Sequence, residues 1–187
     1  IEIPTEQLNV REGKQFLEPF TSMNPFHCVP FLELDDGTVI SESISICRYL
    51  EEIYPNPALF GTTAETRAII DMWLRRFELD GFLPMLHAVR NHLENFKGRV
   101  IPGTRTDLPQ VPQMVTRGIE MGKMFLERVE PHMAENEFDA GSRFSVADIT
   151  AFFTIKVTTP LKIDINASYP GVAAWMDRMS KREAFNI

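Results

Sequence analysis

A small α/β unit followed by an all-helical unit is the fold class that the sequence predicts. Residues 1–53 mix short strand and helix patterns, whereas the rest of the chain carries apolar residues at helical spacing. Between the two regions stand Pro55 and Pro57, and the residue before a proline is disfavoured from the helical conformation. We therefore expect a first domain over residues 1–55 and a helical second domain over residues 62–187.

The composition excludes several classes of protein. The 187 residues are 44% hydrophobic, which is enough to bury a core in one or two small domains. The 19 lysines and arginines stand against 26 aspartates and glutamates, whereas a nucleic-acid binder usually carries a basic patch. No apolar run approaches the roughly 20 residues that cross a bilayer. We therefore expect neither a nucleic acid nor a membrane as a partner, and two cysteines without CxxC spacing favour a reducing compartment.

The first 20 residues carry weak local patterns. Residues 3–10 have a rough strand pattern that a proline weakens. Phe16, Leu17 and Phe20 fit one short amphipathic helical turn. The chain starts at Ile1 without a methionine, and no charged stretch followed by a long apolar stretch marks a signal peptide. We therefore expect the sequence to begin partway through an element of its domain.

A hairpin and a helix are the clearest features of the first region. Residues 29–34 fit a strand, an Asp-Gly pair is typical of a hairpin turn, and residues 38–40 fit the returning strand. Residues 43–53 then predict a helix, because apolar residues recur there at i, i+4 and i+7, namely Ile46, Leu50 and Ile53.

The second region predicts a bundle of helices. Gly118 and Gly122 lie in one of its apolar stripes, where they leave room for another helix to approach closely. Residues 98–112 contain three prolines and two glycines, which predicts a long loop between two helices. The apolar stripes are Ile69, Trp73 and Phe77; Leu86, Val89, Leu93 and Phe96; and Val115, Ile119, Leu126 and Val129.

The segments around Val29-Pro30 and Ser41-Glu42-Ser43 carry the chemistry of a binding site. If the Val29–Pro30 bond is cis, the N–H and C=O of Val29 point outward and can pair with an extended, peptide-like ligand. The first N–H groups of the following helix, together with a serine hydroxyl, suit a carboxylate, and Glu42 suits an ammonium group. These parts together fit a zwitterionic amino-acid group with an extended tail. Ser41 or Ser43 taken alone is more often only a helix cap.

A capping box is expected near the start of a late helix. Ser145 precedes the apolar run of residues 149–157 and Asp148 lies three positions after it, so each side chain can bond the backbone near the other. This element serves folding rather than chemistry.

The order of these motifs resembles the cytosolic glutathione S-transferase family, and among its members the bacterial theta- and delta-like proteins. An Asn-Pro pair before Val29-Pro30, the Asp-Gly turn and the Glu42-Ser43 helix start resemble that family's glutathione-binding half, and residues 141–149 resemble a signature of its helical half. The resemblance covers essentially the whole chain and implies a thioredoxin-like first domain followed by an all-α domain. It extends to a C-terminal set: Tyr169, Pro170, Gly171, Val172, Trp175 and Phe185.

The resemblance also implies where glutathione binds. The backbone of Val29 would hold the cysteinyl part beside a cis Pro30, and Glu42 and Ser43 would bind the γ-glutamyl end. Several insect and related bacterial members place a histidine at the position of His27, where it contacts the glycine carboxylate. An exposed loop histidine is an equal alternative.

Gln15, Cys28 and Cys47 are three further polar or reactive residues of this first region. Gln15 lies where the family often has a polar side chain near the same glycine carboxylate. Cys28 is not at the position of the family's redox cysteine, which lies on the first helix, so we expect no nucleophilic role for it. Cys47 lies on the apolar side of its helix, and we expect it to be buried and inert.

The group that activates the glutathione thiol is expected outside this sequence. The resemblance implies a Tyr, Ser or Cys at the end of the first strand or the start of the first helix. The sequence begins at what resembles the second strand, so about 20 residues, one strand and one helix, are expected to be absent. The tyrosines Tyr49, Tyr54 and Tyr169 lie in other elements.

The function implied by the resemblance is detoxification by conjugation of the glutathione thiolate to small hydrophobic electrophiles. Glutathione would be a co-substrate of a cytoplasmic homodimer that needs no other cofactor and no metal. His87 and His92 are five residues apart and do not share a helix face, which makes them poor metal ligands. The electrophile pocket is expected in the helical domain, near Phe82, Met85 and residues 121–125.

Two alternatives stay open. The first is a non-catalytic glutathione-binding or scaffold protein of the same fold. The second is a glutathione-dependent reductase or isomerase, which requires a cysteine in the absent segment.

Overall fold

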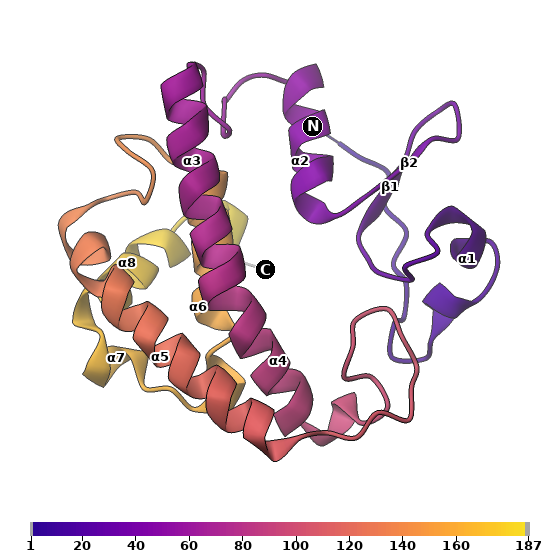
Figure 1. Ribbon diagram of the computed structural model, residues 1–187. Helices are drawn as coiled ribbons and strands as arrows, with labels where there is room; N and C mark the ends of the chain where they lie inside the picture. Colours follow the sequence, from indigo (N-terminus) through magenta and orange to yellow (C-terminus); the bar gives the residue numbers. More distant parts are fainter. Residues whose placement is uncertain (1, 186–187) are drawn as a thin grey trace.

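The computed structural model describes residues 2–185 and divides into an α/β part and a helical part (Figure 1). This arrangement confirms the predicted fold class. The α/β part contains η1 (Lys14–Phe16), α1 (Phe20–Met23), β1 (Phe31–Glu33), β2 (Val39–Ser41) and α2 (Ser43–Ile53). The helical part contains α3 (Ala64–Arg76), η2 (Phe77–Phe82), α4 (Leu83–His92), η3 (Glu94–Phe96), α5 (Pro112–Glu135), α6 (Val146–Lys156), η4 (Thr159–Leu161), α7 (Ile165–Ser168), α8 (Pro170–Ser180) and η5 (Glu183–Phe185).

The β1–β2 hairpin and α2 confirm the prediction for residues 29–53. The strands pair antiparallel, with Phe31 opposite Ser41. Gly37 has φ +82°, which a glycine adopts without strain, and its N–H donates to Leu34 O over 2.9 Å. The helix has the bounds that its apolar spacing predicts.

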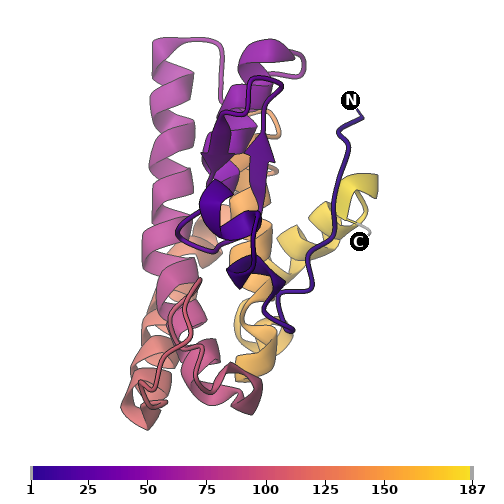
Figure 2. The ribbon, with the colours of Figure 1, turned by 90° about the vertical axis from the view of Figure 1, so that its right-hand side faces the viewer.

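The strand predicted over residues 3–10 is wrong. The structure places these residues in an irregular, mostly exposed segment, drawn as coil in Figure 2. A strand requires a partner for its backbone N–H and C=O groups, and the sheet among residues 2–185 consists of β1 and β2 alone. Residues 3–10 therefore have no neighbouring strand with which to pair.

A π-helical turn, η2, joins α3 and α4. Gly81 lies in this turn, where an added Cβ would come within 2.6 Å of Thr154 Cγ2. The hydroxyl of Thr154, on α6, donates to the carbonyl of Phe77 over 3.3 Å. These contacts hold α6 against η2, and Phe77 is buried in the main hydrophobic cluster.

The apolar stripe of α3 is shifted by one residue from the prediction. Ile69 is exposed, whereas Ile70 and Leu74 are buried together with Phe77. Strict i+4 steps drift around an α-helix, so the spacing Ile70, Leu74 and Phe77 follows one face better than Ile69, Trp73 and Phe77.

Two glycines let α5 pack closely on α4, as the sequence predicts. A Cβ added at Gly118 would overlap Pro84 O and come within 2.8 Å of Ala88 Cβ, and one at Gly122 would meet Met85 Cγ at 2.7 Å. The two helices therefore approach at a distance that a side chain at either position would prevent.

Replacing Gly118 by Val is expected to lower the free energy of unfolding by about 1–3 kcal/mol, because the side chain would force α4 and α5 apart. Urea unfolding followed by circular dichroism measures the change. Glu127→Ala, on an exposed face of α5, is the control and should change the value by less than about 0.5 kcal/mol. An unchanged unfolding midpoint for Gly118→Val would contradict this packing.

The capping box at α6 is confirmed. The carboxylate of Asp148 accepts the Ser145 N–H at 2.7 Å and the Ser145 hydroxyl at 3.0 Å, and it also accepts the N–H of Asp139 at 2.8 Å. One buried carboxylate therefore fixes both the start of α6 and the loop before it.

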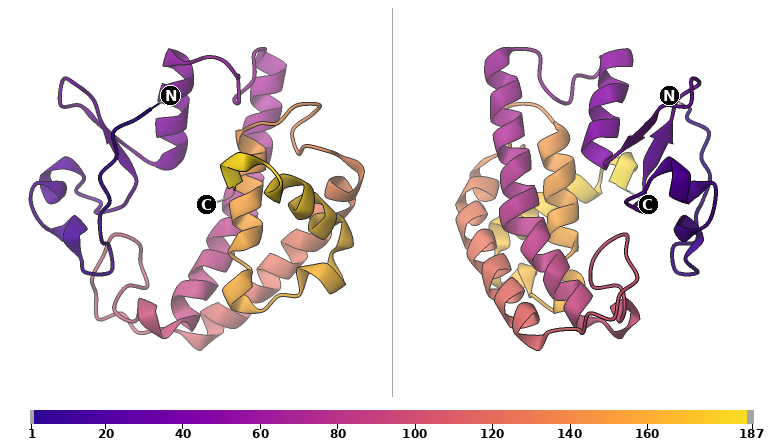
Figure 3. Two further views of the ribbon diagram at one scale, coloured as in Figure 1. Left: turned by 180° about the vertical axis from the view of Figure 1, so that it is seen from behind. Right: turned by 45° about the vertical axis from the view of Figure 1, so that its right-hand side comes forward.

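Among the described residues, the two parts of the chain contact each other near the linker and through the loop that follows η3. Near the linker, Arg48 of α2 forms an ion pair with Asp71 of α3 at 2.6 Å, and the Glu51 carboxylate accepts the N–H groups of Leu59 and Phe60. At the other end, the loop of residues 97–111 reaches from the helical part to the α/β part (Figure 3). Within residues 2–185, no helix is both long and apolar enough to cross a membrane.

Candidate functional site

The β1–β2 register brings the two predicted binding segments together. Pro30 immediately precedes β1, and Glu42 immediately follows β2. Since Phe31 lies opposite Ser41, the residues just before β1 and just after β2 leave the hairpin at the same end. The end of the hairpin therefore gathers four of the predicted site residues.

The backbone of Val29 is free to bind a ligand. The Val29–Pro30 peptide bond is cis, and the Val29 side chain is exposed. Its N–H and C=O have no hydrogen-bond partner among residues 2–185. A free donor and acceptor beside a strand can pair with an extended ligand in the manner of an added strand.

Asn24 holds the turn before Val29, a role that the sequence reasoning missed. The residue is buried, its Nδ2 donates to Cys28 O over 2.8 Å, and its Oδ1 accepts the N–H of Phe26. These bonds occupy the Cys28 carbonyl and leave the next peptide unit free. The Asn-Pro pair in the sequence was the signal, because asparagine side chains often bond the backbone of a turn.

The start of α2 offers a second binding element. Its N-cap is Glu42, with φ 71°, and no side chain caps the helix, so neither Ser41 nor Ser43 acts as the cap that the alternative interpretation required. The first backbone hydrogen bond runs from Ile46 N to Glu42 O, which leaves the N–H groups of residues 43–45 without an acceptor among the described residues. Free N–H groups at the start of an 11-residue helix favour an anion.

The carboxylate of Glu42 places a negative charge beside the start of α2 and acts on the thiol of Cys28. Glu42 is exposed and forms no ion pair with residues 2–185. Burial raises the pKa of the Cys28 thiol, the charge of Glu42 raises it further, and Arg90 opposes both. Because the thiolate is the nucleophilic form of cysteine, this environment disfavours the reactive form of Cys28.

His27 and Gln15 are engaged inside the protein. His27 is half-buried with φ 53°, its Nδ1 lies 3.3 Å from Gly103 O, and its ring packs on that of Phe16. Gln15 is 6% exposed, and its Nε2 donates to Val10 O. The alternative of an exposed loop histidine therefore does not describe His27, and Gln15 faces the protein interior.

The prediction that Cys47 is buried is wrong. It is exposed on α2, because the helix covers the hairpin with a different part of its surface. The pKa of its thiol is nevertheless raised by desolvation, which disfavours the thiolate.

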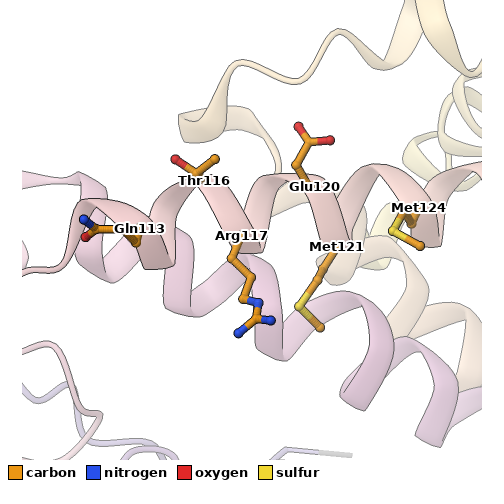
Figure 4. A pocket seen from close by; sticks show the side chains of 6 residues that line it. All are labelled: Gln113, Thr116, Arg117, Glu120, Met121 and Met124. Carbon is orange, nitrogen blue, oxygen red and sulfur yellow. The ribbon is translucent and has the colours of Figure 1, made fainter.

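The region predicted to line an electrophile pocket is divided by α5. Met85 and Phe125 belong to the buried core, whereas Met121 and Met124 are exposed. The exposed side carries an open hollow of about 460 Å³. In Figure 4, Met121 points to the same side of α5 as Arg117, away from Glu120. The hollow is lined by Gln113, Thr116, Arg117, Glu120, Met121 and Met124.

The described residues contain no group of three or more His, Cys, Asp or Glu side chains placed to hold a metal ion. The end of the hairpin offers backbone hydrogen-bonding groups and a charged side chain. A free peptide edge, a helix start with unpaired N–H groups and a carboxylate lie at this end of the hairpin.

Comparison with known proteins finds one family that matches both parts of the chain. The family models for the glutathione S-transferase N-terminal domain and C-terminal domain match residues 2–53 and 119–183. Glutathione S-transferase 1 of Manduca sexta is 29% identical over 95% of this chain and 76% of its own length. Maleylacetoacetate isomerase of Rattus norvegicus is 27% identical over 94% of this chain and 74% of its own. The crystal structure of a class Gtt2 glutathione S-transferase of Vibrio parahaemolyticus superposes with a TM-score of 0.82, at 35% identity, over 99% of this chain and 84% of that one.

Proposed function

Because the chain belongs to the glutathione S-transferase family, we propose that it binds glutathione at the end of the β1–β2 hairpin and transfers its thiolate to small hydrophobic electrophiles. Relatives named glutathione S-transferase align with most of the chain, which supports the assignment as a transferase enzyme. The observation that supports the proposal is the β1–β2 pairing, because Val29-Pro30 and Glu42-Ser43 flank the paired residues Phe31 and Ser41 at one end of the hairpin.

Each part of the site receives one part of glutathione. The Val29 backbone pairs with the cysteinyl unit, because its N–H and C=O are unoccupied. The Ser43 hydroxyl and the first N–H groups of α2 bind the γ-glutamyl carboxylate, and Glu42 binds the γ-glutamyl ammonium group. These contacts hold the γ-glutamyl end and the cysteinyl unit, so the sulfur of the cysteinyl unit has a defined position.

His27 and Gln15 are assigned to the glycine end of glutathione. The Nδ1 of His27 is turned to Gly103, which leaves Nε2 as its ligand-facing atom. We place Gln15 near this end on the family resemblance alone, since its side chain is buried and its Nε2 donates to Val10 O.

The reaction forms a carbon–sulfur bond between the glutathione thiolate and the electrophile, whose leaving group departs with the bonding electrons. The thiolate is the reactive form, so the enzyme must favour it over the thiol. We assign the activating group to none of the described residues. On the family alone we also propose a cytoplasmic homodimer with domains at residues 1–55 and 62–187.

The test is glutathione conjugation by the purified full-length protein. We expect calorimetry to detect glutathione binding, and the absorbance of a chlorodinitrobenzene adduct to rise faster than without enzyme. The control is the same protein with S-methylglutathione, which has no free thiol and should give no adduct. Binding without conjugation would overturn the transferase proposal in favour of a non-catalytic protein.

A glutathione-dependent isomerase is the second candidate, because two rodent relatives named maleylacetoacetate isomerase match about as much of the chain as the transferases do. Such an enzyme would isomerise its substrate in the presence of glutathione without consuming it. Product analysis of the same reaction mixture separates the two activities.

A further inference from the structure

Three arginines gather where α4 ends and the loop of residues 97–111 begins. Arg90 lies in the last turn of α4, and Arg99 and Arg105 lie in the loop. The guanidinium groups of Arg90 and Arg99 both contact the ring of Phe96, with their central carbons 4.7 and 5.4 Å from its centroid. That of Arg105 lies 4.7 Å from the ring of Phe16. Aromatic rings therefore hold all three cations in place.

The charges of these arginines are not compensated within the described residues. Arg90 Nε donates to Val100 O over 3.2 Å, Arg99 donates to a neighbouring backbone carbonyl, and Arg105 donates to Val10 O over 3.3 Å. All of these acceptors are neutral carbonyls, and no carboxylate of residues 2–185 pairs with any of the three. Other hydrogen-bond donors of each guanidinium stay available.

The cations also act on one another. Burial lowers the pKa of the half-buried Arg90, and the charges of Arg99 and Arg105 lower it further. Like charges that lie close together repel one another, and an anion that joins them relieves this repulsion. The arrangement therefore favours binding of a negatively charged group.

The position of the cluster links it to the end of the hairpin. Gly103, between Arg99 and Arg105, has φ 66°, and an added Cβ would overlap Phe26 O and lie 2.9 Å from Cys28 Sγ. The carbonyl of Gly103 lies 3.3 Å from His27 Nδ1. The loop thus packs directly against the residues that precede the cis peptide.

We propose that Arg90, Arg99 and Arg105 form a carboxylate-binding site beside the Val29–Pro30 peptide, and that the protein selects ligands that place a carboxylate there. The planar guanidinium matches a carboxylate with two parallel hydrogen bonds, which a neutral ligand cannot supply. The inference deepens the proposed function and rests on it. The carboxylate has two possible sources, the glycine unit of glutathione and an acidic group on the electrophile.

Two pairs of probes distinguish the sources. Glutathione and γ-glutamylcysteine differ by the glycine carboxylate, and unreactive dinitrobenzoate and its neutral amide differ by the charge on the aromatic ligand. Calorimetry on the full-length protein measures all four dissociation constants. We expect the carboxylated member of at least one pair to bind about tenfold more tightly than its partner, the effect of about 1.4 kcal/mol.

Arginine variants connect that preference to the cluster. Arg90→Gln is expected to remove the preference. The dissociation constant of the carboxylated probe should rise by about tenfold, and that of its partner should change by less than about twofold. Arg105→Gln, at an exposed position, is the second variant if Arg90→Gln fails to fold. Arg128→Gln, an exposed arginine of α5, is the matched control and should keep the preference.

The outcomes decide the proposal separately from the proposed function. Equal binding within both pairs, or a preference that survives in both variants, overturns the carboxylate site. Dinitrobenzoate binding that depends on the arginines, in a protein that binds neither glutathione nor γ-glutamylcysteine, supports the carboxylate site and overturns the proposed function. A variant that loses thermal stability but keeps its preference shows a structural role only, and this also overturns the site.

Discussion

Ser43→Ala is expected to weaken glutathione binding by about 10- to 100-fold, which removes retention on a glutathione-affinity column. The hydroxyl and the free N–H groups at the start of α2 are the proposed partners of the γ-glutamyl carboxylate, and no side chain of the described residues competes for these groups. A hydrogen bond to a charged group is worth more than one between neutral groups, so its loss is measurable in a single variant.

Glu42→Gln tests the other half of the same contact. The substitution keeps the size of the side chain and removes the charge that the proposal pairs with the ammonium group. Glu42 forms no ion pair with residues 2–185, so the loss of its charge should affect ligand binding more than stability. The double variant with Ser43→Ala should bind no more tightly than the weaker single variant.

Ser45→Ala is the matched control, because Ser45 is exposed on the first turn of the same helix. It should be retained like the unmodified protein. Thermal unfolding should show that all these exposed substitutions leave the fold intact. Retention of Ser43→Ala and Glu42→Gln at the original level would mean that the ligand assignment is wrong.

The parts of the fold that sequence predicts well depend on local signals. The hairpin follows from an Asp-Gly turn, α2 from apolar spacing, and the capping box from Ser145 and Asp148 three residues apart. The meeting of the Val29 and Ser43 segments follows from them as well, because a tight hairpin fixes its register by the turn.

The failures concern properties that depend on distant parts of the chain. Residues 3–10 have a strand pattern without a partner, and Cys47 has an apolar helix position without a neighbour to cover it. The arginine cluster was missed for the same reason. Its members come from a helix end and an irregular loop, and they meet only because the loop packs on Phe26 and Cys28. No spacing rule relates such positions.

Asp139 is another residue whose environment arises only in the folded protein. It is 1% exposed, and neither oxygen of its carboxylate has a hydrogen-bond partner among residues 2–185. Burial, followed by the nearby charge of Asp148, raises its pKa to about 8, and Arg178 opposes this effect. The side chain is therefore protonated in the native protein at neutral pH.

This pKa makes the stability of the protein depend on pH. The ordinary pKa of the carboxyl is 3.8, so between pH 4 and 8 the folded state binds a proton that the unfolded state has released. Stability rises with pH where the unfolded state binds more protons than the folded state. Here the folded state binds more protons, so stability falls as the pH rises. The contribution of Asp139 is thus complete below the unfolded pKa and is lost as the pH rises through the folded pKa.

Asp139→Asn should therefore stabilise the protein at pH 8, by an amount on the order of 3–5 kcal/mol, and leave it nearly unchanged at pH 4. Urea unfolding at several pH values between these limits measures the difference. His132 also contacts this loop, with Nε2 2.9 Å from the Asp139 carbonyl, and it is present in both proteins. The difference between them therefore reports the titration of Asp139 together with its effect on the neighbouring Asp148, whose pKa is also raised by burial. Glu137→Gln, at an exposed neighbouring position, should follow the pH profile of the unmodified protein. Parallel profiles for Asp139→Asn and the unmodified protein would show that the Asp139 carboxyl titrates normally, since only a shifted pKa couples this residue to folding.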